Sequence, residues 1–478
     1  IVLKGEFYFP SFTSSSAMIN VPGDRSIDFV GSDAIIHLPQ NNYTGQAWLF
    51  SVANTSLDSY NVIRFKNFVV VDDVNTGTYA SNFLVTSGTG LGVEMEDIVF
   101  YNSPNYSSGT TVWFNNCLHA VVRNVRFHNT VRTGLLFDSV AVGTVSNSLF
   151  MSRNPVGSGV AISVGTGNVT ITNSEFYGLN IAINASDTDG ESTIHVSNSI
   201  FGLNRGSYFT LSNGSVWNMG VNYVIYVHNI SSLRIFMSNI VFEGYNFLGG
   251  DTFTTNLDIE ISDSMLTSLV TYVQYSSNGG AGKIRINASN CQLGGADFTG
   301  GPGFLGNGRV NNIETIPAEY YLDNCKIFMN VPGNYAPLHF IDNHYIGQYG
   351  VTSVSGKLSI SNSLIWFKNT SSTQYTAGIS NINTEDALNI YEYVDLRNNT
   401  IIFDGPINAY LFEDPYGSNS SYANITGYFT DNNIQLLNGA TLAGLSYQVG
   451  NFSVVVRRNA GYVTENSGVA TIPAGSTS

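Results

Sequence analysis

The residues that could perform chemistry are few and scattered. Charged residues make up 11% of the 478-residue chain. Asp187, Asp189 and Glu191 carry oxygen ligands at alternate positions, as a hard cation such as calcium prefers. The segment lacks the rest of an EF-hand loop, so we interpret it as a solvated turn. We expect no bound metal and no cofactor.

One acidic pair offers an alternative catalytic site. Glu385 and Asp386 are adjacent in a long polar segment. Glycoside hydrolysis needs two carboxyl groups that flank the scissile bond, and such groups could supply them. Solvated charge is the favoured interpretation of this pair. The sequence therefore predicts no catalytic residue.

A third polar group lies in the segment HFIDNHY, which contains His339, Asp342 and His344. In a strand, Asp342 and His344 would share one face while His339 would point to the other. A metal or catalytic role for these three residues is disfavoured.

The elements that must position any site come from a repeat. The stretches VVRNVRF, TVSNSLF, TITNSEF and HVSNSIF share the order apolar, any, Asn, any, any, Phe, at spacings of about 23 to 26 residues. Apolar and polar side chains alternate in each copy, which indicates two short strands. Asn tolerates the left-handed conformation that a sharp bend between them needs. A coil that cannot bury its own apolar face must stack on the next, and this predicts a β-solenoid.

The bend position returns along most of the chain. It is occupied by Asn67, Asp97, Asn124, Asn147, Asn173, Asn198, Asn239, Asp263, Asn290, Asn324, Asn362, Asn398 and Asp431, and a poorer copy surrounds Asn459. The residues two before and three after the bend are apolar and form two interior ladders. One of them contains Phe100, Phe127, Phe150, Phe176, Phe201 and Phe242.

We therefore predict an all-β chain folded as a single parallel β-helix of about 14 or more coils. Residues 1–60 are its opening coils, 61–460 its main part, and 461–478 a linker or the start of a C-terminal module. The copies spread apart in the C-terminal half, so some residues must leave the stack as insertions, where solenoids place binding surfaces. The predicted insertions are 205–232, 294–319, 333–356 and 368–391.

The template, with an Asn closing the second strand of each coil, resembles the pectin-lyase-like superfamily. The opening segments GEFYFP and SIDFVGSDAIIHL also look like the start of that fold. The resemblance covers roughly residues 1–460 and implies a single-stranded, right-handed parallel β-helix. That superfamily includes polysaccharide lyases, hydrolases, viral tailspikes and surface adhesins, so it implies no single function. The NTD, GHG and RIK motifs of its pectin-degrading members do not occur in this sequence.

Composition narrows the classes of function. The formal net charge of −15 argues against nucleic-acid binding, which needs clustered Lys and Arg. The sequence contains no run of about 18 apolar residues, so no membrane-spanning helix is predicted. The chain begins at Ile1 without a visible signal peptide, and we interpret this as a processed or truncated N-terminus.

The favoured function is an extracellular, non-enzymatic β-helix on a virion or cell surface. It would act as a viral spike, a fibre or an adhesin, and its insertions would bind carbohydrate or a cell-surface receptor. The alternatives are a polysaccharide lyase or glycoside hydrolase, and an architectural subunit of a capsid or surface layer.

Two kinds of covalent modification are predicted. Cys291 and Cys325 each follow a bend residue, so stacking would place them about 4.8 Å apart, which a disulfide permits. The alternative is a pair of small buried residues on a ladder otherwise filled by serine. Sequons in turns are glycosylation candidates if the protein is secreted by a eukaryote or archaeon: Asn42, Asn54, Asn105, Asn184, Asn213, Asn229, Asn369, Asn419 and Asn424.

The outward residue two places after the bend is often apolar. Leu149, Ile200, Val241 and Met265 are the main members of this ladder. Large exposed apolar patches mark contact sites, so the sequence predicts a homo-oligomer or assembly into a particle. The alternative is that insertions of the same chain cover this face.

Overall fold

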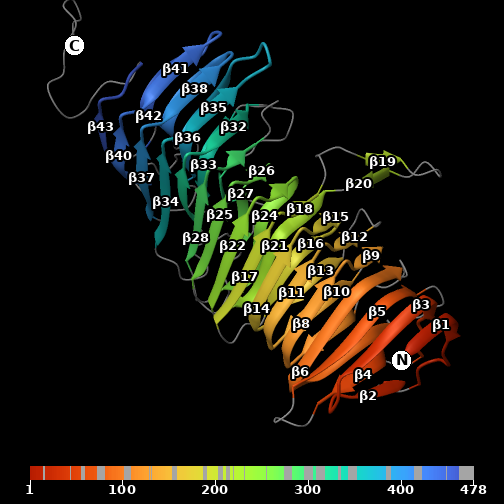
Figure 1. Ribbon diagram of the computed structural model, residues 1–478. Helices are drawn as coiled ribbons and strands as arrows, with labels where there is room; N and C mark the ends of the chain where they lie inside the picture. The colour runs from red at the N-terminus through yellow and green to blue at the C-terminus, as the bar shows by residue number, and fades with distance from the viewer. Residues whose placement is uncertain are drawn as a thin grey trace, which may run out of the picture. The chain divides into compact units, whose positions relative to one another are not determined.

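The structure is a computed structural model. It describes residues 1–13, 17–42, 45–54, 60–72, 81–101, 109–128, 130, 132–152, 159–186, 191–202, 208–210, 216–218, 220–230, 232–253, 256–267, 269–273, 283–294, 305–307, 318–331, 335–342, 353–383, 389–413, 423–447, 449 and 451–461. The chain divides into two compact units, Ile1–Gly250 and Asp251–Ser478. The described residues form strands and turns without a helix (Figure 1). The predicted all-β, parallel solenoid is confirmed.

Three strands form each regular coil. A longer strand leads to the bend, a short strand follows it, and a third strand closes the coil. We call the three resulting sheets the pre-bend face, the post-bend face and the third face. The strands of these three faces pair in parallel with their equivalents in neighbouring coils, for example β11 (Val140–Ser146) with both β8 (Cys117–Arg123) and β14 (Gly167–Thr172).

In the first unit some strands span two faces. The remaining strands of this unit are β1 (Val2–Tyr8), β2 (Ile19–Pro22), β3 (Ile27–His37), β4 (Ala47–Ala53), β5 (Asn61–Val71), β6 (Ser81–Tyr101), β7 (Thr110–Asn115), β9 (Arg126–His128), β10 (Thr133–Asp138), β12 (Leu149–Met151), β13 (Val160–Val164), β15 (Glu175–Tyr177), β16 (Ile181–Ser186), β17 (Glu191–Ser197), β18 (Ile200–Phe201), β19 (Tyr208–Thr210), β20 (Val216–Asn218), β21 (Val221–Ile230), β22 (Ser232–Ser238) and β23 (Val241–Phe242). β24 (Gly244–Phe253) contains the boundary between the units.

The second unit repeats the order of strands. It contains β25 (Leu257–Ser262), β26 (Met265–Leu266), β27 (Leu269–Val273), β28 (Ile284–Ser289), β29 (Gln292–Leu293), β30 (Leu305–Asn307), β31 (Ala318–Asp323), β32 (Lys326–Asn330), β33 (Tyr335–Asp342), β34 (Ser353–Ser361), β35 (Leu364–Lys368), β36 (Tyr375–Asn383), β37 (Asn389–Arg397), β38 (Thr400–Asp404), β39 (Ile407–Glu413), β40 (Ala423–Thr430), β41 (Asn433–Leu437), β42 (Thr441–Tyr447) and β43 (Asn451–Arg457).

The predicted insertions also contribute to the stack. β21, β30, β33 and β36 lie within the segments 205–232, 294–319, 333–356 and 368–391 and pair as third-face strands. Each coil needs a third strand to close, so these segments do not leave the solenoid entirely. The antiparallel pair β19–β20 lies outside the parallel pattern.

The bends are where the sequence places them. All thirteen predicted bend residues, from Asn67 to Asp431, have left-handed backbone with φ between 49° and 60°. Asp33 has the same conformation at an upstream position that the template missed. In the last copy the prediction is wrong by one residue, because the bend residue is Arg458, with φ of 51°, and not Asn459.

The phenylalanine column is confirmed as one stack in the first unit. Neighbouring ring centroids from Phe100 to Phe201 lie 4.6–5.1 Å apart with nearly parallel planes. Phe242 follows in register with Phe201, and every member of the column is fully buried. This is the apolar core of the post-bend face.

A buried polar ladder lies directly after the bends. The Ser148 hydroxyl donates to Ser146 O over 2.9 Å and accepts the N–H of Val125, one coil earlier, over 3.2 Å. Ser174 repeats both contacts one coil later, with Thr172 O and the N–H of Ser148. Each of these side chains therefore satisfies a backbone N–H that faces the interior at a bend.

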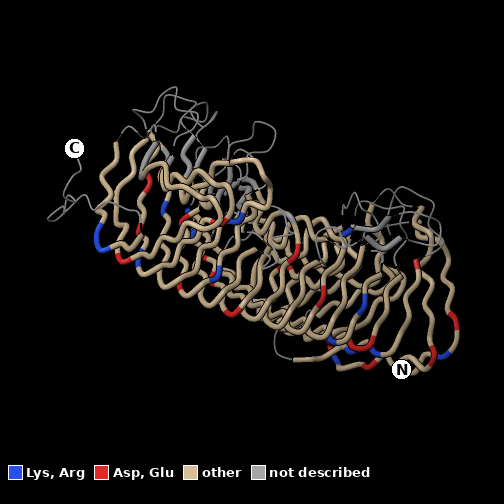
Figure 2. The backbone as a smooth tube through the Cα atoms, turned by 90° about the horizontal axis from the view of Figure 1, so that it is seen from above, with Lys and Arg blue, Asp and Glu red and all other residues tan. Residues whose placement is uncertain are grey.

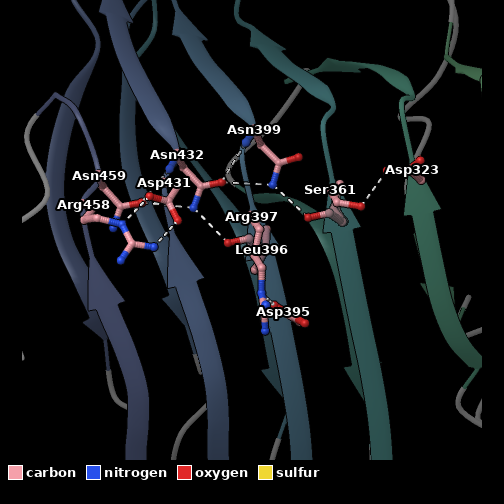
Figure 3. Close-up of polar contacts among 11 residues, drawn as sticks. Asp323, Ser361, Asp395, Leu396, Arg397, Asn399, Asp431, Asn432, Arg458 and Asn459 are labelled. Carbon is pink, nitrogen blue, oxygen red and sulfur yellow. Dashed lines mark hydrogen bonds and ion pairs between the residues drawn. The ribbon is translucent and has the colours of Figure 1, made fainter.

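Near the C-terminal end of the ladder, asparagine replaces serine (Figure 3). Asn432 Oδ1 accepts the N–H of Asn399 over 3.0 Å, while its amide nitrogen donates to Leu396 O over 3.0 Å. Asn459 does the same for the N–H of Asn432 and for Phe429 O. This explains the shifted bend, because Asn459 points inward while Arg458 takes the bend and binds the Asp431 carboxylate over 2.6 and 2.7 Å.

Cys291 and Cys325 occupy the same ladder as free, buried thiols. The Cys291 thiol lies 3.2 Å from Ser289 O, and the N–H of Cys325 donates to Ser363 Oγ over 2.9 Å. The structure therefore has the small buried ladder residues that were the alternative to a disulfide.

Replacing Asn432 tests the polar ladder. In Asn432→Ala the Asn399 N–H and the Leu396 carbonyl lose their partners, and an unsatisfied buried group costs about 1–3 kcal/mol. We expect a loss of at least about 2 kcal/mol in the free energy of unfolding, measured by urea denaturation. Asn432→Ser should lose less, because serine fills the ladder in other coils. The exposed Asn433→Ala is the control, and an equal loss in both alanine variants would refute the ladder's role.

Candidate functional site

The predicted acidic sites fall mainly outside the described residues. Asp187, Asp189, Glu385 and Asp386 lie there, as does His344. Glu191 begins β17, where it aligns with Ser232. Within the described ranges, no group of three or more His, Cys, Asp and Glu side chains could hold a metal ion.

The structure joins His339 to partners that the sequence did not suggest. His339 lies on β33, Ser380 on the neighbouring strand β36, and Glu392 on the pre-bend strand β37. The Glu392 carboxylate lies 2.7 Å from His339 Nδ1 and accepts a hydrogen bond of 2.5 Å from Ser380 Oγ. The His339 and Glu392 side chains are 1% and 0% exposed. The Tyr320 ring packs edge-on against His339, with the ring centroids 5.6 Å apart.

This cluster has the residue types of a catalytic triad without its order. A nucleophile needs the histidine next to its hydroxyl, so that the imidazole can take the proton. Here Glu392 lies between Ser380 and His339. All three side chains are also buried, and a substrate cannot reach them. We interpret the cluster as a satisfied polar part of the core.

A second buried polar cluster lies in the first unit. Arg132 donates to Asn82 Oδ1 over 3.0 Å and to Ser81 O over 2.7 Å, and its guanidinium lies 3.8 Å from the Asp72 carboxylate. Arg132 and Asp72 are both 2% exposed. Buried charges persist only when they are paired, so this contact also belongs to the fold.

On the pre-bend face of the first unit, the charged residues pair across coils. Lys66 contacts Glu96 over 2.7 Å, as their shared outward position predicts. This contact lowers the pKa of the Glu96 carboxyl, with a smaller contribution from the charge of Arg123. Arg64 bridges Glu94 and Asp28 in the same way. Such exposed pairs contribute about 0–1 kcal/mol each and form no reaction centre.

The Tyr60 hydroxyl lies 2.6 Å from Nδ1 of His119 on the same face. Burial lowers the pKa of His119 below its ordinary value; the charge of Glu94 opposes this shift, and the charge of Arg64 adds to it. The imidazole is therefore neutral at neutral pH and can form a neutral hydrogen bond with the phenol.

The pre-bend face of the second unit presents a strip of tyrosines. Tyr321 on β31, Tyr391 and Tyr393 on β37, and Tyr428 on β40 all lie on its outer side. Tyr391 is 49% exposed and Tyr428 is 41% exposed. Both lie beside polar residues in register, Tyr391 beside Ser355 and Tyr428 beside Asp395.

Cations lie among these rings. Lys357 Nζ lies 4.6 Å from the centroid of the Tyr321 ring and 5.1 Å from that of Tyr393. The Arg397 guanidinium lies 5.0 Å from the Tyr428 centroid and also contacts Asp395 over 2.5 Å. Cation–π contacts therefore restrain the rings of Tyr321, Tyr393 and Tyr428.

We call Tyr321, Lys357, Tyr391, Tyr393, Arg397 and Tyr428 the tyrosine strip. It combines aromatic faces with hydrogen-bonding groups on neighbouring strands. Charged residues are otherwise sparse along the described chain (Figure 2). The strip can hold a ligand that has both apolar and hydroxyl-rich surfaces, and its ordered side chains lose little entropy on binding.

The sequons differ in accessibility. Asn42 is exposed, Asn184 and Asn424 are half-buried, and Asn54 and Asn369 are buried. The Asn369 amide donates to Thr373 O and to Pro406 O, each over 2.8 Å. The remaining candidates have no described side chain, namely Asn105, Asn213, Asn229 and Asn419.

The predicted interface residues are half-buried and face outward. Leu149, Ile200 and Val241 lie on the post-bend face of the first unit, and Met265 lies on that of the second. Among the described residues, no helix is long and apolar enough to cross a membrane.

No protein-family model matches the sequence, and a search of curated proteins finds no significant match.

Replacing His339 tests whether the buried cluster is structural. His339→Phe leaves the buried Glu392 carboxyl with the Ser380 hydroxyl as its remaining side-chain partner among the described residues. Breaking a buried pair typically costs about 3–5 kcal/mol, and we expect a loss of that size in the free energy of unfolding. The control is His195→Phe, because His195 is exposed and stacks on Phe236 with centroids 4.9 Å apart. Equal stability of the two variants would show that the cluster contributes nothing.

Proposed function

We propose that this chain is an extracellular, non-enzymatic β-helix that binds carbohydrate at a virion or cell surface. In this proposal it is a spike, fibre or adhesin of the pectin-lyase-like type. The parallel solenoid with asparagine bends supports the fold part of the proposal. The tyrosine strip is the observation that carries the binding part.

The strip suits a sugar for a physical reason. The C–H groups on one face of a pyranose ring pack on an aromatic face, while its hydroxyls need hydrogen-bonding partners at the rim. Tyr391 and Tyr428 offer exposed rings, and Ser355, Asp395 and Asn424 lie next to them in register. Aromatic residues combine apolar contact area with a polar group, which favours them in binding sites.

The charges favour a neutral or weakly charged glycan. Glu319 and Asp395 lie on the strip's face, and each contacts a cation, Lys283 over 2.6 Å and Arg397 over 2.5 Å. The whole chain carries a formal charge of −15, which repels long polyanions. The strip extends the expected binding surface from the insertions to the sheet itself.

The enzymatic alternative lacks comparable support. A lyase or hydrolase needs a reachable acid or base, and the carboxyl groups named on the strip are engaged in ion pairs. Incubating the protein with a panel of polysaccharides distinguishes the two functions. Retention of full-length chains is expected, and chain shortening would contradict the non-enzymatic assignment.

Glycan-array binding tests the strip. We expect the wild-type protein to bind a neutral oligosaccharide, and the double variant Tyr391→Ala/Tyr428→Ala to bind it at least about tenfold more weakly, equivalent to about 1.4 kcal/mol. The phenylalanine versions should retain most affinity, because the ring faces remain. Tyr60→Ala is the control, since Tyr60 is 55% exposed in the first unit. The absence of any glycan ligand for the wild-type protein would overturn the proposal.

A further inference from the structure

The post-bend face of the first unit is a mainly apolar surface that follows one ladder. Its outward residues are aligned coil by coil by the pairing of the strands: Val69, Val99, Arg126, Leu149, Glu175, Ile200 and Val241. The five apolar members are half-buried, whereas Arg126 and Glu175 are exposed. Figure 1 shows β9, β12, β15 and β18 following one another along this face.

The equivalent ladder on the pre-bend face is polar throughout. It consists of Lys66, Glu96, Arg123, Ser146, Thr172, Ser197 and Ser238. Both ladders face outward on the same coils, so the difference lies in their side chains and not in the fold. An aligned apolar row on one face of a charge-poor protein marks a contact surface.

The order of residues along the apolar ladder has a symmetry. Leu149 is at its centre, with Arg126 one coil before it and Glu175 one coil after it. Further out, Val99 and Ile200 are each two coils from Leu149, and Val69 and Val241 bracket them. Positions at equal distances on either side of Leu149 therefore match: two and three coils away both residues are apolar, and one coil away the two residues carry opposite charges.

We propose that this face binds a second copy of the same chain, with the two ladders antiparallel about a two-fold axis at Leu149. The axis lies in the interface along the strand direction. Leu149 then faces its own counterpart, and Arg126 of each copy faces Glu175 of the other. Val99 packs on Ile200 and Val69 on Val241 across the contact. Most homodimers use such an isologous contact, in which one patch is complementary to itself.

The charges select this arrangement over the parallel one. If the ladders ran in the same direction, Arg126 would face Arg126 and Glu175 would face Glu175 across the contact. Like charges at an interface are strongly unfavourable, whereas the antiparallel arrangement makes two ion pairs. Arg126 has no carboxylate partner within the described part of the chain, so it is available for this contact.

The five central members of the neighbouring ladder on the same face also fit this axis, whereas its outer pair sets Val71 opposite Glu243. Its members Tyr101, His128, Met151 and Tyr177 follow in register. Met151 lies beside Leu149 near the axis, so it also faces its counterpart. Tyr101 is 46% exposed, and the antiparallel arrangement places it opposite Gly202, which has no side chain to clash with it.

The expected dimer is reversible. Coils are about 4.8 Å apart, so the contact from Val69 to Val241 is about 29 Å long. The short strands make it narrow, which places it among the small interfaces of transient complexes. This contact does not depend on glycan binding, because the tyrosine strip lies on a different face of the other unit.

Charge reversal tests the arrangement by sedimentation equilibrium. Arg126→Glu alone and Glu175→Arg alone each create repulsive pairs, and we expect either to raise the dimer Kd at least about tenfold. The double variant restores opposite charges only if the ladders are antiparallel, and its Kd should return to within about threefold of wild type. Arg123→Glu, the same charge change on the pre-bend face of the same coil, is the control. A double variant no better than the single variants would overturn the antiparallel contact.

Cross-linking provides an independent readout for a weak dimer. Face-to-face sheets are about 10 Å apart, so a short bismaleimide should link two copies of Leu149→Cys across the axis. Ile200→Cys should not link to itself, but should link to Val99→Cys when the two variants are mixed. The native cysteines are buried, and the wild-type protein controls for them. Self-linking of Ile200→Cys, or a wild-type monomer at about millimolar concentration, would overturn the proposal.

Discussion

The structure depends on one hydrogen-bond requirement at the bends. A left-handed residue turns the chain between two strands, and the N–H of the next residue then faces the interior, where water cannot reach it. Buried N–H groups in folded proteins are nearly always paired. Here the partner is a side chain one coil further on, Ser148 for Val125 and Asn432 for Asn399. Where the residue after the bend is serine or asparagine, the later coil therefore completes the earlier one, and these contacts help to set the register of the stack at its corners.

This requirement explains which features can be predicted from the sequence. The bend residue and the apolar positions around it recur at fixed offsets, so a local template finds them in thirteen copies. The template fails at Arg458 because it treats asparagine as the bend residue wherever it occurs. Asn459 is needed inside as an acceptor for Asn432, and the ion pair with Asp431 holds Arg458 in the bend. Contacts with the preceding coil therefore decide whether Arg458 or Asn459 occupies the bend, and a local template cannot detect such contacts.

The candidate sites were less predictable for a related reason. His339 and Glu392 are 53 residues apart, and their contact depends on how much chain lies between consecutive coils. The same holds for Tyr321, Tyr391 and Tyr428, which lie on one face only because β31, β34, β37 and β40 stack in register. The alternation of Tyr391 and Tyr393 was a local signal for a shared face. It could not show which residues of other coils lie beside them.

The tyrosine strip and the apolar post-bend face of the first unit suit different partners. The polar groups of the interior ladder and of the buried clusters have partners within the fold, so among the described residues the outer faces are the surfaces that can contact a partner. In the proposed function the tyrosine strip would give a weak individual contact with a sugar, and the proposed dimer face would give a weak contact with another copy. Linked weak contacts become strong, because once one is made the next is an intramolecular event. A repetitive surface covered with glycans would present many such contacts at once. Within each unit a stacked sheet would suit that task, since its side chains would already be in place before the partner arrives.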